Sequence, residues 1–325
     1  MNITRSTVLA IAAATALATS TLVSAAGYPE KPVTITVGFS AGGPTDIVAR
    51  VLAEKLTQKF GQSFIIDNKA GASGAVAANL VKKATPDGYT LMIGSSSTLS
   101  IIPYVQKGVQ FDPIKDFTPI ALVASYPYYL TVPPDSKFKT YDDLVAFARL
   151  KGNQLTYGSA GNGAINHLAG EWFKSETGIN SLHVPYKGDS AAVIDLAAGR
   201  VDFAFLAGVV AIPQVQAGKL RILASASSAA DKGLKDTLVI GQQKLPGFAA
   251  EPWNGLMGPA GLPADVVNKL NAAVNEIMSS PEVKTKLLTL DQYPLTSTSG
   301  QFKDYIQKQS THWAGVIKKS NIVFD

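Results

Sequence analysis

Apolar and polar residues recur with two different periods along the chain after residue 32. Residues 33–37 are all β-branched and alternate in polarity, which predicts a strand. Residues 47–60 place apolar side chains three and four positions apart, which predicts a helix with one buried face that ends at Gly61. The alternation continues with strands at 64–66 and 89–93 and a helix at 75–84. Strands that alternate with helices indicate a parallel sheet covered by helices on both faces.

A second cycle of the same kind begins near residue 126. Its predicted strands cover 128–132, 154–157, 182–184, 201–205 and 220–224, and its predicted helices cover 141–150 and 165–177. A strand at 254–257 and long helices at 264–278 and 300–318 complete the chain. We therefore expect an α/β protein of two lobes, each a mostly parallel sheet flanked by helices. Lobe 1 would comprise 27–125 plus 251–325, and lobe 2 would comprise 126–250.

The first 26 residues have the pattern of a cleaved secretory signal peptide. Arg5 is their only charged side chain, an uncharged Ala-rich run follows, and small residues end the segment at Ala25 and Ala26. A membrane anchor is disfavoured because the apolar run is too short to span a hydrocarbon core of ~30 Å comfortably. The chain contains no Cys, so no thiol-linked lipid can be attached. We expect a soluble mature protein outside the cytoplasm.

Composition excludes several classes of function for these 325 residues. The absence of Cys excludes disulfides, thiolate catalysis and iron–sulfur clusters, and three His leave little for a metal site, so we expect neither metal nor cofactor. Lys and Arg number 29 against 24 Asp and Glu, but they are scattered and form no stripe interleaved with aromatic residues. Nucleic-acid binding is therefore not expected. The small positive excess suits an anionic ligand.

Two glycine-rich turns, at 38–46 and 157–164, each connect a predicted strand to a predicted helix. Such turns lie at the carboxyl ends of parallel strands, where open α/β sheets bind ligands. Glycine lets backbone N–H groups approach an anion closely, and a helix N-terminus adds about half a positive charge. One turn from each lobe would make an anion clamp across a cleft. The alternative is that these glycines serve only tight turns.

An enzyme is the competing hypothesis, because residues 38–42 match the nucleophile-elbow pattern with Ser40 at its centre. In α/β-hydrolases several strands precede the elbow and supply the oxyanion loop, whereas Ser40 follows the first predicted strand. An acid and a base, such as Asp202 and His312, can be nominated only arbitrarily. Neither turn matches a P-loop or a dinucleotide-binding fingerprint.

Several side chains near the turns have two readings each. Asp46 would receive a ligand ammonium or, as favoured here, stabilise the start of the helix. Phe39 would stack on a ligand or fill the space between the lobes. The hydroxyls of residues 95–98 would reach the cleft or cap the next helix. We expect His167 to bond the second turn's backbone, and we expect packing roles for Trp172, Trp253 and Trp313.

The ordered motifs of the mature chain resemble the tripartite tricarboxylate transporter substrate-binding proteins, also called Bug receptors. The resemblance starts at residues 28–32 and 39–50 and extends over essentially the whole mature chain. It includes the segments 61–62, 68–74, 86–91, 116–119, 157–161, 183–188, 199–202, 217–221 and 253–256.

The resemblance implies a type II-like, two-lobed periplasmic binding protein that closes on a small carboxylate, with a di- or tricarboxylate as the first choice. It implies a monomer that delivers its ligand to a membrane permease of one large and one small subunit. An amino acid or an aromatic carboxylate is the alternative ligand class, and a secreted serine hydrolase that uses Ser40 is the alternative of another kind. The expected ligand-binding residues are Phe39, Ser40, Ala41, Gly42, Gly43, Thr45, Asp46, Ser95, Ser97, Thr98, Ser159, Ala160, Gly161, Asn162, Gly163, Ala164, Asn166 and Asp202.

The sequence departs from the family pattern in one segment, and a second segment carries candidates for specificity. Members of the family carry an Arg followed by a Pro-rich run at the place where this chain has residues 227–236. The resemblance therefore implies no function for the far rim of lobe 2. Asn162 lies within the second turn, and Asn166 follows the turn by two residues. We interpret them as candidates for contacting the distal group of the ligand.

Overall fold

The computed structural model describes residues 27–106, 108–150, 152–228 and 234–319. The expected signal peptide, residues 1–26, lies outside the described residues, as does part of the divergent segment 227–236. Among the described helices, none is long and apolar enough to cross a membrane.

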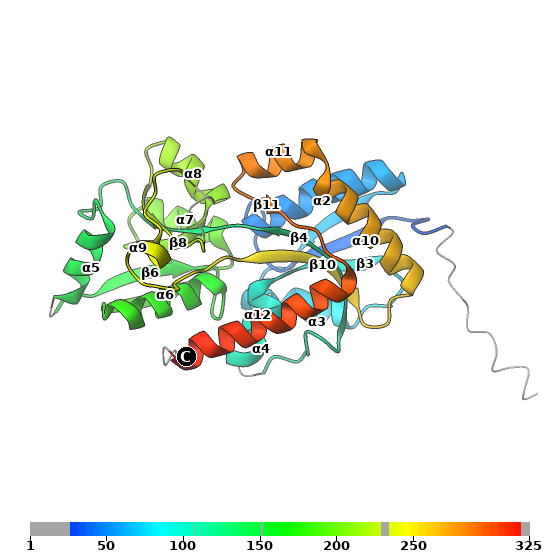
Figure 1. Cartoon of the computed structure of the whole chain (residues 1–325), viewed down its shortest axis with the longest axis horizontal. Coiled ribbons are helices and arrows are strands. Elements are labelled where there is room, and N and C mark those ends of the chain that lie inside the picture. The colour runs from blue at the N-terminus through cyan, green and yellow to red at the C-terminus, as the bar shows by residue number, and fades with distance from the viewer. Residues whose placement is uncertain (1–26, 107, 151, 229–233, 320–325) are drawn as a thin grey trace, which may run out of the picture.

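Two β-sheets form two halves of the molecule that lie side by side (Figure 1). The first sheet has the order β11-β4-β10-β3-β1-β2. Its β1 pairs in parallel with β2 and β3, whereas β10 lies antiparallel between β3 and β4. We call the half built on this sheet lobe 1. Its strands are β1 (Val33–Val37), β2 (Phe64–Asn68), β3 (Thr90–Ser95), β4 (Phe117–Ser125), β10 (Trp253–Pro259) and β11 (Tyr293–Pro294).

The second sheet has the order β7-β6-β8-β5-β9 and defines lobe 2. Its β6 pairs in parallel with β7 and β8, and β5 lies antiparallel between β8 and β9. Each sheet thus has one antiparallel strand inserted among parallel strands, and the edge strand β11 of the first sheet also runs antiparallel to its neighbour β4. The strands of lobe 2 are β5 (Tyr128–Val132), β6 (Leu155–Ser159), β7 (Ser181–Pro185), β8 (Phe203–Ala207) and β9 (Arg221–Ser225).

Helices cover both sheets, as the alternating pattern predicted (Figure 1). In lobe 1 they are α2 (Pro44–Phe60), α3 (Ala75–Lys82), α4 (Ile102–Val105), α10 (Ala264–Ser279) and α11 (Pro281–Thr289). In lobe 2 they are α5 (Tyr141–Arg149), α6 (Ile165–Thr177), α7 (Asp189–Ala197), α8 (Gly208–Gln216) and α9 (Ile240–Gln243). Short single-turn segments cover Ala72–Gly74 and Ser97–Ile101. The two-lobed α/β architecture is therefore confirmed.

The chain crosses between the lobes more than once. It passes from β4 to β5 at residues 125–128, and it returns to β10 near residue 253. The last helix, α12 (Ser299–Lys319), begins on lobe 1, where Phe302 packs edge-on against Trp253. Further along, Trp313 packs against Trp172 in lobe 2. The helix α12 therefore contacts both halves of the molecule. The expected lobe boundaries, at 125/126 and 250/251, stay predictions.

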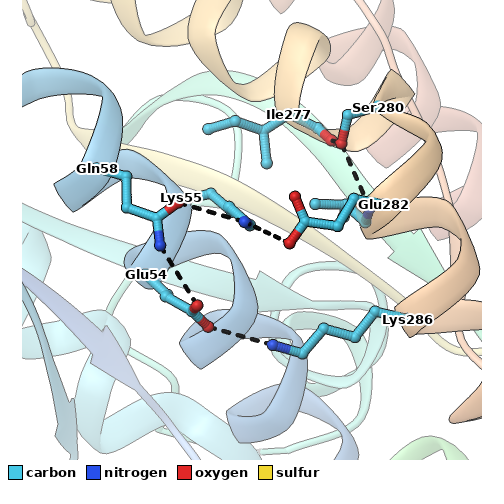
Figure 2. A network of polar contacts seen from close by, with 8 residues as sticks. Glu54, Lys55, Gln58, Ile277, Ser280, Glu282 and Lys286 are labelled. Atoms are coloured by element: carbon cyan, nitrogen blue, oxygen red, sulfur yellow. Dashed lines mark hydrogen bonds and ion pairs between the residues drawn. The ribbon is translucent and has the colours of Figure 1, made fainter.

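Surface ion pairs hold α11 beside α2 on the outer side of lobe 1. Figure 2 shows the ion pairs of Lys55 with Glu282 and of Lys286 with Glu54. Their N–O distances are 2.6 and 3.2 Å. The side chain of Glu282 is 71% exposed, and that of Glu54 is 50% exposed. Water screens such pairs, so each contributes at most about 1 kcal/mol. They help to orient α11 against α2, and none of the four paired residues lines either cavity described below.

Candidate functional site

The first glycine-rich turn leaves the carboxyl end of β1 and enters α2. Gly42 has φ +76°, a conformation that favours glycine. Gly43 is the N-cap residue and Pro44 opens the helix. The first intrahelical bond runs from Ile47 N–H to the Gly43 carbonyl. The N–H groups of residues 45 and 46 precede that bond, so the start of α2 offers backbone donors and the positive end of the helix dipole.

Asp46 fastens this turn from within. Its carboxylate accepts hydrogen bonds from Gly42 N–H, from the Arg50 guanidinium and from Asn68 Nδ2, each at 2.9 Å. Burial opposes ionisation, but the hydrogen bonds from Arg50, Gly42 and Asn68 outweigh it and hold the Asp46 pKa below its ordinary value. The oxygens of Asp46 face these donors, so the carboxylate braces the turn, and its place among the ligand-binding residues stays a prediction.

The second turn, between β6 and α6, is braced by side chains of its own lobe. Ala160 N–H donates to Asn166 Oδ1, and Gly161 N–H donates to Ser159 Oγ. Gly163 has φ +74°, and its N–H donates to His167 Nδ1, as expected for His167. These donors are occupied within the turn. The backbone donors at the start of α2 are therefore better placed to grip an anion than these three.

A pair of histidines supports the second turn. The rings of His167 and His183 stack with centroids 3.6 Å apart, and Ser159 Oγ lies 2.6 Å from His183 Nε2. Burial, with the neighbouring His183 and then Lys174, lowers the His167 pKa to about 3. Burial and Lys174 lower the His183 pKa to about 4. Both rings are therefore neutral near pH 7, which lets His167 Nδ1 accept the Gly163 N–H.

Hydrogen bonds across the lobes hold the cleft closed. Lys187 of lobe 2 accepts, through its carbonyl, from the N–H and the hydroxyl of Ser40 at 3.1 and 2.8 Å. Ser73 donates to the Asn162 carbonyl at 2.7 Å. Ile165 N–H, at the start of α6, donates to Ser97 Oγ of lobe 1 at 3.0 Å. The two turns thus face one another with few atoms between them.

Two cavities remain between the lobes. The outer cavity has a volume of about 290 Å³ and is lined by Gly38, Phe39, Gly71, Ala72, Ser73, Gln106, Ala160, Gly161, Asn162, Pro185, Tyr186 and Lys187. The inner cavity has a volume of about 20 Å³ and is lined by Phe39, Gly43, Pro44, Thr45, Ser95, Ser97, Tyr126, Tyr128, Ala160 and Asp189. Phe39 and Ala160 border both cavities, so these two side chains separate them. Phe39 also packs on Ala164, which makes it a filler between the lobes.

Polar groups crowd the inner cavity although almost no water reaches them. Asp189 is 2% exposed and Thr45 is 3% exposed. Tyr126 and Tyr128 are also buried, with ring centroids 5.9 Å apart. Burial, followed by the nearby Asp189 carboxylate, raises the pKa of both phenols far above the ordinary value. These hydroxyls are therefore neutral hydrogen-bonding groups around a buried acid.

The structure brings most of the expected ligand-binding residues to these cavities or directly behind them. Phe39, Gly43, Thr45, Ser95, Ser97, Ala160, Gly161 and Asn162 line a cavity. Ser40, Ala41, Gly42, Asp46, Thr98, Ser159, Gly163, Ala164 and Asn166 belong to the two turns or brace the residues that line the cavities.

Asp202 is the exception among the expected ligand-binding residues. The structure corrects its expected place at the cleft. It precedes β8 and accepts from the N–H and the hydroxyl of Thr156, near the start of β6. The amino ends of parallel strands lie at the edge opposite the two turns, so Asp202 lies away from the cleft.

Sequence reasoning missed Gln106, Tyr126, Tyr128, Tyr186 and Asp189. The oxygen Gln106 Oε1 is buried without a hydrogen-bond partner and lies at the outer cavity. Tyr128 reaches the cleft because β5 runs antiparallel to β8 and pairs Tyr128 with Ala207, at the carboxyl end of β8. That pairing leaves no local signal in the sequence, so no periodicity could have identified these residues.

The structure gives the serine-hydrolase hypothesis no support at Ser40. Its hydroxyl donates to the Lys187 carbonyl rather than to a base. Ser40 has no positive φ, in contrast to the strained backbone of a nucleophile elbow. His312 lies on α12, where its ring packs edge-on against Trp313, and Asp202 bonds Thr156. In the described part of the chain, no group of three His, Asp or Glu side chains could hold a metal ion.

Comparisons with known proteins agree with this geometry. The model of the tripartite tricarboxylate transporter family receptor matches residues 48–322. BugT of Bordetella pertussis is 31% identical over 303 residues, which is 92% of each chain. The structure of Rpa4515 of R. palustris with adipate has a TM-score of 0.87 and 32% identity, covering 91% of this chain and 99% of that one. The structure of MatC from Rhodopseudomonas palustris with bound malate has a TM-score of 0.84 and 30% identity, covering 89% and 100%.

Proposed function

The chain belongs to the tripartite tricarboxylate transporter receptor family, and on that premise we propose that it captures a small organic carboxylate between its two lobes. A di- or tricarboxylate is the first choice, which the adipate and malate bound by two similar proteins support. The observation that carries the proposal is the start of α2, where backbone donors and Thr45 border a cavity closed by lobe 2.

Closure of the lobes would be the signal that a ligand is bound. Because the hydrogen bonds from Ser40 and Ser73 cross the cleft, a ligand that contacts both lobes favours the closed form by its differential affinity. We propose that the closed receptor, a monomer in the periplasm after removal of the signal peptide, delivers its ligand to a permease of one large and one small subunit. It would need no cofactor and would bind no nucleic acid.

An amino-acid or aromatic-carboxylate receptor is the second candidate, because the buried Asp189 carboxylate lies in the same cleft. The proposal is tested on protein expressed from its full sequence and purified as the cell exports it. Thermal unfolding is measured against a panel of mono-, di- and tricarboxylates and amino acids, and native mass spectra reveal any ligand that co-purifies. A ligand at a hundredfold excess over its Kd stabilises by about 2.7 kcal/mol, a clear shift. Stabilisation by none of them, or turnover of an activated ester, would contradict the receptor.

A further inference from the structure

Asp189 is a buried acid that the carboxylate-binding role leaves unexplained. It is the first residue of α7 and is 2% exposed. Its Oδ1 accepts from Asn166 Nδ2 at 2.9 Å, and its Oδ2 accepts from Ala207 N–H at 3.3 Å. Within the described residues no Lys or Arg pairs with it, although burying a carboxylate is costly without a cation. A carboxylate can accept about four hydrogen bonds, so two positions are left.

The surroundings of Asp189 are suited to a small cation. The inner cavity has a volume of about 20 Å³, and a volume of roughly 10–15 Å³ on this measure holds one water molecule. An ammonium group is of that size. The carboxylate on the neighbouring carbon is larger, so it fits at the start of α2 only when the Phe39 side chain, which separates the two cavities, shifts. The hydroxyls of Tyr126, Tyr128 and Ser95 can accept hydrogen bonds from an ammonium, and all three residues border the cavity.

The same cavity has opposite electrostatic character on its two sides. Lobe 1 contributes the start of α2, whose dipole favours an anion. Lobe 2 contributes Asp189, which favours a cation. The outer cavity of about 290 Å³, beyond Phe39 and Ala160, has room for the rest of a small ligand. An amino acid carries both charges on neighbouring atoms and would neutralise both sides when the lobes close.

We propose that Asp189 is a specificity-determining residue that binds the ammonium group of an amino acid whose carboxylate lies at the start of α2. This proposal rests on the proposed carboxylate-receptor function and narrows its ligand class. Burial raises the pKa of Asp189 to about 7, so above that pH it is mostly ionised. The ionised form would repel a plain dicarboxylate, because like charges in a buried site are destabilising. Asn166 acts as the positioning residue, because its side chain joins the Asp189 carboxylate to the Ala160 N–H.

The test compares acids that differ only by an amino group. Isothermal titration near pH 8 uses four pairs: succinate and aspartate, glutarate and glutamate, adipate and 2-aminoadipate, and 3-phenylpropionate and phenylalanine. The wild-type protein should bind the amino member of at least one pair roughly 10- to 100-fold more tightly, the range expected for a hydrogen-bonded charge. Asp189→Asn should remove that preference and change the affinity for the plain acid little.

Asp142→Asn is the matched control, because Asp142 also lies in the first turn of a helix, α5, but is 69% exposed and pairs with Lys244. It should leave every affinity unchanged. If Asp189→Asn does not fold, the wild-type series still decides the question. Equal or tighter binding of the plain acids by the wild type, or an equal loss for both members in Asp189→Asn, would overturn the role of Asp189 alone. Binding of none of the eight acids would overturn the carboxylate receptor and this inference with it.

Discussion

Replacing Asp46 by Asn should destabilise the protein through the first glycine-rich turn. The carboxylate has two oxygens that each accept two hydrogen bonds, from Gly42 and Arg50 on Oδ2 and from Arg50 and Asn68 on Oδ1. An Asn side chain keeps the shape but turns one oxygen into an NH₂ group. The two hydrogen-bond donors that faced the replaced oxygen then face the N–H groups of the NH₂. The negative charge of the carboxylate, which attracted Arg50, is lost.

The expected loss follows from these contacts. Hydrogen bonds to charged groups contribute about 1.5–3 kcal/mol each. Asp46 is 2% exposed, but the Arg50 side chain is 52% exposed and its share is reduced by solvent screening. Two lost acceptor positions therefore cost about 2–4 kcal/mol in total. For a protein of this size that corresponds to a decrease in Tm of roughly 3–6 °C.

Calorimetry of the wild type and of Asp46→Asn at several pH values measures this effect. The folded-state pKa of Asp46 lies below its unfolded value of about 3.9, so its stabilisation is present above that pH and is lost as the pH falls through the folded pKa. The difference in Tm should be constant near pH 7 and shrink near pH 3. Glu54→Gln is the control, since its exposed pairing with Lys286 should change Tm little. A difference that is negligible near pH 7, or that does not depend on pH, would refute the reasoning.

Three further predictions concern the cleft and its support. Gly43→Val should fold, because Gly43 has φ −82°, which other residues adopt. An added Cβ would lie 3.3 Å from the Ser40 carbonyl oxygen, a tight contact that requires a shift of a few tenths of an ångström, and its bulk should weaken carboxylate binding about tenfold or more in titrations. Ser73→Ala removes one hydrogen bond to Asn162 across the cleft and should weaken ligand binding roughly fivefold while Tm without ligand changes little; an unchanged Kd would contradict it. The depressed pKa values of His167 and His183 predict that the free energy of unfolding falls as the pH drops below about 6.5, where unfolded His takes up protons. In denaturant titrations at several pH values, His183→Asn should reduce this pH dependence of the free energy of unfolding. An unchanged pH dependence would contradict the prediction.

Local patterns predicted the elements that bury one face. The strand β1 and the helices α2 and α6 were predicted because their apolar residues recur with the period of a strand or a helix. The strand β4 and the helices α7, α8 and α11 were missed. In β4 nearly every residue is buried, so no alternation marks it as a strand. In α8 a mid-helix Pro213 and an apolar composition obscure the helical pattern.

The site was predictable only as far as it is local. Both glycine-rich turns were found because each follows directly on a strand and opens a helix. Asp189 was not found, because its position in the cleft depends on how α7 packs against β8 and α6. Asp202 was placed with the ligand-binding set although it lies at the amino edge of its sheet, where ligands of open α/β folds do not bind.

The central claim is that the start of α2 binds a ligand carboxylate between the two lobes. Isothermal titration of the exported protein with its best ligand, and with the same ligand whose carboxylates are converted to primary amides, tests it most directly. The account predicts that the acid binds and that the amide binds at least roughly tenfold more weakly, because the α2 dipole favours only the anion. It also predicts that Gly43→Val loses most of this discrimination. Equal binding of the acid and the amide by the wild-type protein would contradict the claim.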